Sequence, residues 1–361
     1  MPHSNQKVLL SLRLVLDTCN AALDPAAVPP EPASESVQVL RKDLVSLMSL
    51  LYAATTKVSL ALKPSKPTYS AALAPLKDLS DHVSALFHCA NLFVPHIQGA
   101  TLVREVHSLV RDAIESIKAL SQTFLEIEAS DSRQGSGQAG DEYMVRTATV
   151  HSVLDKARAL SPDNVAAVRK QWKEDAASLE DGFREVGDMI DEEESEADVQ
   201  DDDDFDDGWG GIGIGKSQKM TLEERDRTKK IHGILRLSQL LHKRILRDHL
   251  LPSPPLDNPT LDALAISSRQ LLSASDDLVA TLYTPQDPKR METELAAFRK
   301  IISNFQASLS GANATPDAVA TQIASLSLTK AANQESLKWF DTCFVQLFKA
   351  VEILDDILRQ T

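Results

Sequence analysis

Four residues near the middle of the chain match a pattern that binds nucleotide phosphates. The pattern G-x-x-x-x-G-K-[ST] is met by Gly210, Gly215, Lys216 and Ser217. A working loop of this kind follows a buried strand and opens a helix, so that backbone N–H groups converge on the phosphates. Here residues 191–207 precede it with twelve Asp or Glu and no Lys or Arg, and the next helix start is Thr221. We interpret the match as a glycine-rich linker.

Other patterns that support catalysis or metal binding are absent from the sequence. It contains no H-E-x-x-H, C-x-x-C or G-x-S-x-G, and no histidine has Glu three residues before it. His242 and His249 lie seven residues apart on one predicted helix, in a Leu-rich context that favours an interface over a metal site. The acidic run lacks the spacing of an EF-hand, which favours solvated charge over Ca²⁺ binding. We expect a protein without metal, cofactor or enzyme activity.

The negative charge of the chain is concentrated in one segment. The formal net charge of the 361 residues is −14, and residues 191–207 contribute −12, which leaves −2 for the remainder. The three cysteines, Cys19, Cys89 and Cys343, are far apart within apolar helical patterns. They are typical of buried thiols in a reducing compartment.

Apolar residues recur at helical spacing along most of the chain, and the alternation typical of strands is absent. The predicted helices cover 5–23, 34–62, 67–94, 100–129, 142–160, 162–190, 221–251, 257–283, 288–309, 316–327 and 331–359. Ser161 and Pro162 have the residue types of a helix start, and Thr221 with Glu224 forms a capping-box pattern. No stretch is a convincing signal peptide or membrane span.

The sequence predicts an all-α fold of long antiparallel helices in one or two packed bundles, interrupted by an acidic disordered linker. The expected parts are an N-terminal helical domain (1–190), the linker (191–218) and a C-terminal helical domain (219–361).

Residues 216–249 hold ten Lys or Arg against four acidic residues, but no Phe, Tyr or Trp that would stack on bases. Nucleic-acid binding is therefore disfavoured.

Three collinear stretches resemble the cyclin-D1-binding protein 1 family, also called Grap2 and cyclin-D-interacting protein. They read "QGATLVREVHSLVRDAIESIKAL", "SPDNVAAVRKQWKEDAASLEDGFREV" and "SASDDLVATLYTPQDP". The similarity extends across nearly the whole chain and includes the acidic interruption followed by Trp209. None of the three stretches is a catalytic signature.

The resemblance implies a non-enzymatic protein that binds D-type cyclins and other regulators, such as helix-loop-helix partners, and restrains cell-cycle entry and transcription. It also implies residence in the nucleus and cytoplasm. Two other classes stay open. The stretch "LAISSRQLLSASDDLVATLY" looks like the helical bundles of the cytoskeletal scaffolds talin and vinculin. A nucleotide enzyme has only the glycine-rich segment in its favour.

The last predicted helix is the candidate partner-binding element. Its predicted inner stripe comprises Leu337, Phe340, Phe344, Leu347, Val351 and Leu354. Four further residues widen the apolar surface, namely Trp339, Val345, Phe348 and Ile357. Aromatic side chains are the usual energetic centres of interfaces, and four of the seventeen in the chain lie between Trp339 and Phe348. We hypothesise a groove or ridge for a partner helix, formed by this edge with His242 and His249 of the 221–251 helix.

Overall fold

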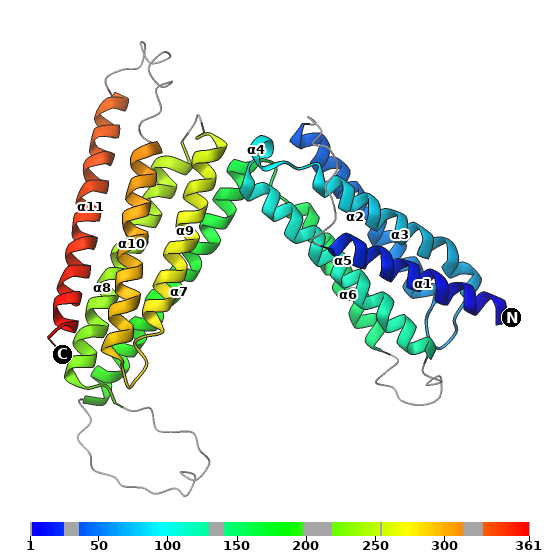
Figure 1. The fold of residues 1–361 in the computed structure, drawn as a ribbon, viewed down its shortest axis with the longest axis horizontal. Coiled ribbons are helices and arrows are strands. Elements are labelled where there is room, and N and C mark those ends of the chain that lie inside the picture. The colour runs from blue at the N-terminus through cyan, green and yellow to red at the C-terminus, as the bar shows by residue number, and fades with distance from the viewer. Residues whose placement is uncertain are drawn as a thin grey trace, which may run out of the picture. The chain divides into compact units, whose positions relative to one another are not determined.

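A computed structural model of this chain describes residues 2–24, 36–129, 141–197, 219–252, 255–312 and 328–360. All regular elements in these ranges are helical, which confirms the predicted all-α fold (Figure 1). The chain divides into two compact units, residues 1–167 and 168–361.

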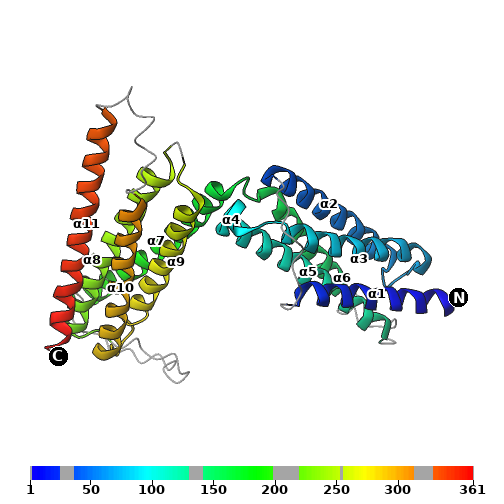
Figure 2. The same ribbon diagram turned by 45° about the horizontal axis from the view of Figure 1, so that its top comes forward.

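In the N-terminal unit, the described residues form a ring of five long helices. They are α1 (Pro2–Leu23), α2 (Val37–Ala61), α3 (Tyr69–Asn91), α5 (Ala100–Ala129) and α6 (Glu142–Asp155). Helix α1 packs on α3 and α5, α2 packs on α3 and α6, and α6 packs on α5 (Figure 2). The short helix α4 (Pro95–Gln98) precedes α5, and the 3₁₀ turn η1 (Lys156–Ala159) follows α6. Each long helix contributes to one apolar core, for example with Leu12, Leu44, Leu76, Val106 and Val150.

The described part of the C-terminal unit also has five long helices. They are α7 (Asn164–Ala197), α8 (Leu222–Ile245), α9 (Asn258–Val279), α10 (Pro288–Ala312) and α11 (Leu328–Leu358), and the π-helical turn η2 (Leu246–Leu250) extends α8. Helix α10 packs between α9 and α11, and α11 packs on α8. Helix α7 completes the ring, because the Gln239 side chain of α8 donates to its Leu179 carbonyl at 2.9 Å and its Gln171 side chain donates to the Ala265 carbonyl of α9 at 2.8 Å.

The division between the units falls inside α7, earlier than the predicted domain boundary after residue 190. The reason is the burial of Trp172, whose ring stacks on His242 of α8 at 4.2 Å and meets Phe305 of α10 edge-on at 6.1 Å. From Val168 onward α7 is therefore part of the C-terminal core. Composition changes at residue 191, whereas tertiary packing changes near residue 168.

The predicted linker is only partly covered by the structure. Helix α7 is described to Ala197, seven residues into the predicted linker 191–218. Residues 198–218, with the Gly210, Gly215, Lys216 and Ser217 pattern, lie outside the described residues, as does all of the predicted helix 316–327.

The capping box predicted at the start of α8 is confirmed. The Thr221 hydroxyl accepts a hydrogen bond from the Glu224 N–H at 3.2 Å, and the Glu224 carboxylate accepts one from the Thr221 N–H at 2.8 Å. The same carboxylate accepts from the buried N–H of Gln286 at 2.9 Å, so this cap also holds the segment before α10. The predicted helix start at Ser161 is wrong: α7 begins at Asn164, and the preceding Asp163 side chain accepts from the Ala166 N–H at 2.8 Å.

One glycine of the N-terminal unit is required by its surroundings. Gly99, between α4 and α5, has a φ of 92°, which disfavours residues with a Cβ. A Cβ at this position would lie 2.0 Å from Cγ of Asn164. The Asn164 side-chain oxygen occupies that space because it accepts a hydrogen bond from the Leu102 N–H at 3.0 Å, in the first turn of α5.

Helix α2 is long and apolar enough to cross a membrane by length and composition, a feature that the sequence analysis did not single out. Core helices of globular proteins pass the same test, and α2 buries Leu40, Leu44, Met48, Leu51 and Val58 in its unit.

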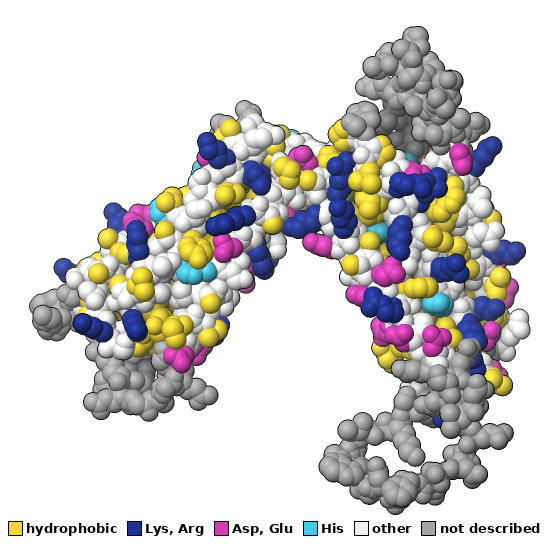
Figure 3. Space-filling view, turned by 180° about the vertical axis from the view of Figure 1, so that it is seen from behind, with side chains coloured by type: hydrophobic (Ala, Val, Ile, Leu, Met, Phe, Trp, Pro, Cys, Tyr) yellow, Lys and Arg dark blue, Asp and Glu magenta, His cyan; other side chains and the backbone are white. Residues whose placement is uncertain are grey.

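The visible face of each unit carries charged side chains of both signs among apolar ones (Figure 3). Such mixed surfaces are normal for helical bundles.

The predicted burial of the three cysteines is confirmed. Cys19, Cys89 and Cys343 are all buried and free. Burial raises the pKa of the Cys19 thiol to about 12, and that of the Cys89 and Cys343 thiols to about 11. All three side chains therefore act as small apolar residues at neutral pH.

Candidate functional site

The inner stripe of α11 is buried as predicted, with one exception. Phe340, Phe344, Leu347, Val351 and Leu354 all belong to the core. Leu337 does not, because 43% of its surface is exposed. The first turns of α11 therefore present more apolar surface to solvent than the stripe predicted.

The four residues expected to widen this surface do not form one patch. At 3.6 residues per turn, Trp339 and Ile357 share one edge of α11, whereas Phe348 is about 180° from Trp339. Both Trp339 and Phe348 are partly buried, while Val345 points outward with 61% of its surface exposed. Of the four residues, only Trp339 and Ile357 therefore share an edge of α11.

Trp339 is held between an arginine of α8 and a phenylalanine of its own helix. The Arg244 guanidinium carbon lies 5.1 Å from the centroid of the Trp339 ring, which is a cation–π geometry. Phe340 also meets the Trp339 ring edge-on, with centroids 5.3 Å apart and planes at 87°. The half-buried indole is thus fixed at the edge where α8 and α11 pack together.

A carboxylate holds the arginines beside this indole. Asp248 in the π turn accepts hydrogen bonds from Nε of Arg244 at 2.6 Å, from Nε of Arg247 at 2.7 Å and from the Ser336 hydroxyl at 2.6 Å. Burial alone would raise the pKa of Asp248, but these hydrogen bonds outweigh it and lower the pKa to about 2. Asp248 therefore stays ionised and joins α8, the π turn and α11. We call Trp339, Arg244, Arg247, Asp248 and Ser336 the α8–α11 edge.

The π turn also places His249 against α11. Its ring lies 5.2 Å from that of Phe340 at an angle of 38°, and its Nε2 is buried without a hydrogen-bond partner in the described part of the chain. Burial lowers the pKa of His249, while the neighbouring Asp248 opposes that change. His249 thus lies next to the α8–α11 edge, and its predicted role in partner binding stays a prediction.

His242 does not belong to this surface, and its assignment to a partner site is wrong. Only 1% of its surface is exposed, and burial lowers its pKa to about 3. Its ring stacks on Trp172 and its Nε2 is 2.8 Å from the Ser268 hydroxyl of α9. The seven-residue spacing from His249 suggested a shared face, but the two side chains pack against different helices.

His242, Ser268 and Asp175 have the residue types of a hydrolytic triad, but their hydrogen bonds are arranged differently from those of such a triad. The Ser268 hydroxyl donates to Oδ2 of Asp175 at 2.6 Å and accepts from Nε2 of His242. Because the serine proton takes part in the hydrogen bond to the carboxylate, the histidine cannot remove it. Among the described residues no group of His, Cys, Asp or Glu could hold a metal ion. The group is a polar connection within the core.

Sequence reasoning missed Arg244, Arg247, Asp248 and Ser336 as parts of the site. The only local signal was the four-residue spacing of Arg244 and Asp248, which is common on exposed helix faces. Their convergence on Trp339 depends on the packing of α11 against α8, to which no sequence pattern points.

The helical rings and the α8–α11 edge define a class of all-α protein built from two bundle units, one of which carries a fixed aromatic edge. Residues 43–192 match the family model for the N-terminal region of the Grap2 and cyclin-D-interacting proteins, and residues 200–307 match that for the C-terminal region. The two matches together span more than half of the chain, so this chain belongs to the Grap2 and cyclin-D-interacting family. A comparison with curated proteins gives no match.

Proposed function

We propose that this chain is a non-enzymatic interaction protein that binds regulatory proteins of the cyclin-D or Grap2 type and thereby influences cell-cycle progression and transcription, in the nucleus and cytoplasm. Family membership supports the choice of partner class. The α8–α11 edge is the proposed contact, and Trp339 held by Arg244 and Phe340 is the observation that carries it.

A fixed aromatic ring suits partner binding for an energetic reason. Ordering a side chain at an interface costs about 0.5–1.5 kcal/mol, and a ring already held between two neighbours avoids most of that cost. Trp and Arg are also the residue types most enriched among the dominant contacts of interfaces. Arg247, which is exposed and paired with Asp248, adds positive charge to the α8–α11 edge. This edge favours a partner helix with an apolar stripe and acidic flanks.

The test is capture of a purified D-type cyclin, and separately of Grap2, by the full-length protein. Trp339→Ala should weaken capture at least tenfold while the protein stays folded. Ile266→Ala is the matched control, because Ile266 is an exposed apolar residue of the same unit on α9. Equal capture by the two variants would place the contact elsewhere and refute this site. Absence of capture by the unsubstituted protein would refute the partner class.

The proposal also predicts that nucleotides are not ligands. Calorimetry of the full chain with magnesium and ATP should give no saturable heat, because the dense acidic run repels a polyanion. Micromolar binding that Lys216→Ala abolishes would show instead that the glycine-rich segment is a phosphate loop.

A cytoskeletal scaffold is the second candidate, and the two bundles of long antiparallel helices favour it. Fold alone is a weak argument for function, so this candidate needs its own test. Sedimentation with actin filaments distinguishes it, since the scaffold would enter the pellet and the regulatory protein would not.

A further inference from the structure

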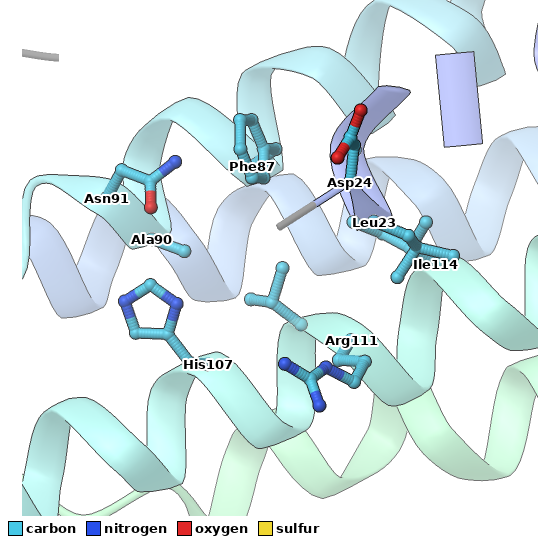
Figure 4. Close-up of a pocket in the computed structure, with 10 residues that line it drawn as sticks. Leu23, Asp24, Phe87, Ala90, Asn91, His107, Arg111 and Ile114 are labelled. Atoms are coloured by element: carbon cyan, nitrogen blue, oxygen red, sulfur yellow. The ribbon is translucent and has the colours of Figure 1, made fainter. Parts of the chain in front are cut away.

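The N-terminal unit contains a cavity that the proposed function does not use. It has a volume of about 260 Å³ and lies where the end of α1 meets α3 and α5 (Figure 4). Its apolar wall is formed by Leu23, Phe87, Val110 and Ile114. These side chains come from three helices, so the cavity is part of the bundle itself.

The remaining wall is polar and rich in hydrogen-bond donors. Nδ2 of Asn91 is buried and has no hydrogen-bond partner in the described ranges. His107 and Arg111 lie one turn apart on α5, and the His107 side chain extends toward Ala90 and Asn91 of the facing helix α3 (Figure 4). Burial, and secondarily the charge of Arg111, lower the pKa of His107, so its neutral ring keeps one N–H.

This combination identifies the chemistry of a ligand. A buried amide donor without an acceptor is energetically unfavourable, and a ligand oxygen would supply the missing acceptor. The guanidinium of Arg111 favours an anionic oxygen over a neutral one. The one acidic residue of the lining, Asp24, directs its carboxylate away from His107 and Arg111 in Figure 4.

We propose that this cavity binds a small amphipathic carboxylic acid, with the carboxylate at Asn91, His107 and Arg111 and the apolar part against Phe87 and Ile114. Its volume of about 260 Å³ suits a small molecule rather than a protein segment. This volume lies just below the usual ligand-pocket range of about 300–1,000 Å³, which favours a compact acid with one ring or a short branched chain.

The test uses 4-phenylbutyrate as the probe and 4-phenylbutanol as its uncharged counterpart. Calorimetric titration of the full chain should give saturable binding of the acid with a submillimolar Kd, and the alcohol should bind at least tenfold more weakly. Arg111→Gln should weaken binding of the acid at least tenfold. Ala22→Leu, which adds volume to the cavity wall, should reduce binding of both compounds.

Arg104→Gln is the matched control. Arg104 is exposed, lies seven residues before Arg111 on the same face of α5 and does not line the cavity. It should bind the acid like the unsubstituted protein. Three results would overturn the proposal: no saturable binding of the acid, equal affinity for the acid and the alcohol, or equal effects of the two arginine substitutions. Unchanged melting curves for both arginine variants would exclude unfolding as the cause.

Discussion

The Arg244 guanidinium lies over the Trp339 ring, at 5.1 Å from its centroid, while its Nε donates to Asp248 at 2.6 Å. One arginine is therefore oriented by a carboxylate and in turn holds an indole. A cation–π contact of this kind contributes about 0.5–1 kcal/mol at a partly exposed site, enough to fix a ring without burying it. Truncation of a core residue of α11 should therefore mainly lower stability, whereas truncation of an edge residue should mainly weaken partner binding.

Phe340→Ala and Trp339→Ala should separate stability from binding. Phe340 is 5% exposed, and its truncation should lower the free energy of unfolding by about 3–5 kcal/mol. Trp339→Ala should cost about 1–2 kcal/mol, because part of its ring already faces water. Urea titrations followed by circular dichroism measure both. Equal losses for the two variants would mean that Trp339 is a core residue.

Acid should destabilise the C-terminal unit through His242. The folded pKa is about 3, against about 6.5 in an unfolded chain. Between these values the unfolded state binds a proton that the folded state does not, so stability falls as pH decreases from about 6.5 to 3, by up to about 1.4 kcal/mol per pH unit. His242→Gln should remove this slope, and a comparison at pH 8 gives the separate cost of lost packing.

Tryptophan fluorescence reports this transition selectively. Trp172, Trp209 and Trp339 are the three tryptophans of the chain, and all lie within residues 168–361. An unaltered pH slope in the His242→Gln variant would show that another group carries the proton.

Removal of the α8 capping box should have a graded effect. Thr221→Ala should cost about 0.5–2 kcal/mol, the usual range for an N-cap. Glu224→Ala should cost more, because it also leaves the buried N–H of Gln286 without its acceptor. Leu222→Ala is the control, since 84% of that side chain is exposed. Thermal melts would contradict this reading if the Glu224 variant were the more stable of the first two.

Two glycine-to-alanine substitutions should have opposite signs. Gly99→Ala would force a Cβ into Asn164 at a positive φ and should destabilise the N-terminal unit by more than about 2 kcal/mol. Gly233 is inside α8, and a Cβ there meets no atom within 4 Å. Gly233→Ala should stabilise the C-terminal unit by about 0.5–1 kcal/mol. Hydrogen exchange measured for each unit separately checks both signs.

Local features of the fold were predictable from the sequence. The capping box depends on two residues three apart, and the buried stripe of α11 follows from its helical period. The face of His242 was not predictable, because the π turn that follows it alters the relation between His242 and His249. The cavity near Arg111 was equally inaccessible, since its walls come from helices far apart in sequence.

From Val168 onward α7 packs in the C-terminal core, although residues 198–218 separate it from the next helix in the sequence. A backbone break introduced by an engineered protease site between residues 198 and 218 would separate α7 from α8 in sequence only. The fragments should still elute together on native gel filtration and separate only in denaturant, because Trp172 remains enclosed by α8 and α10. A fragment of residues 219–361 prepared alone would instead lack one of its five helices, and should aggregate unless the upstream piece is supplied in trans.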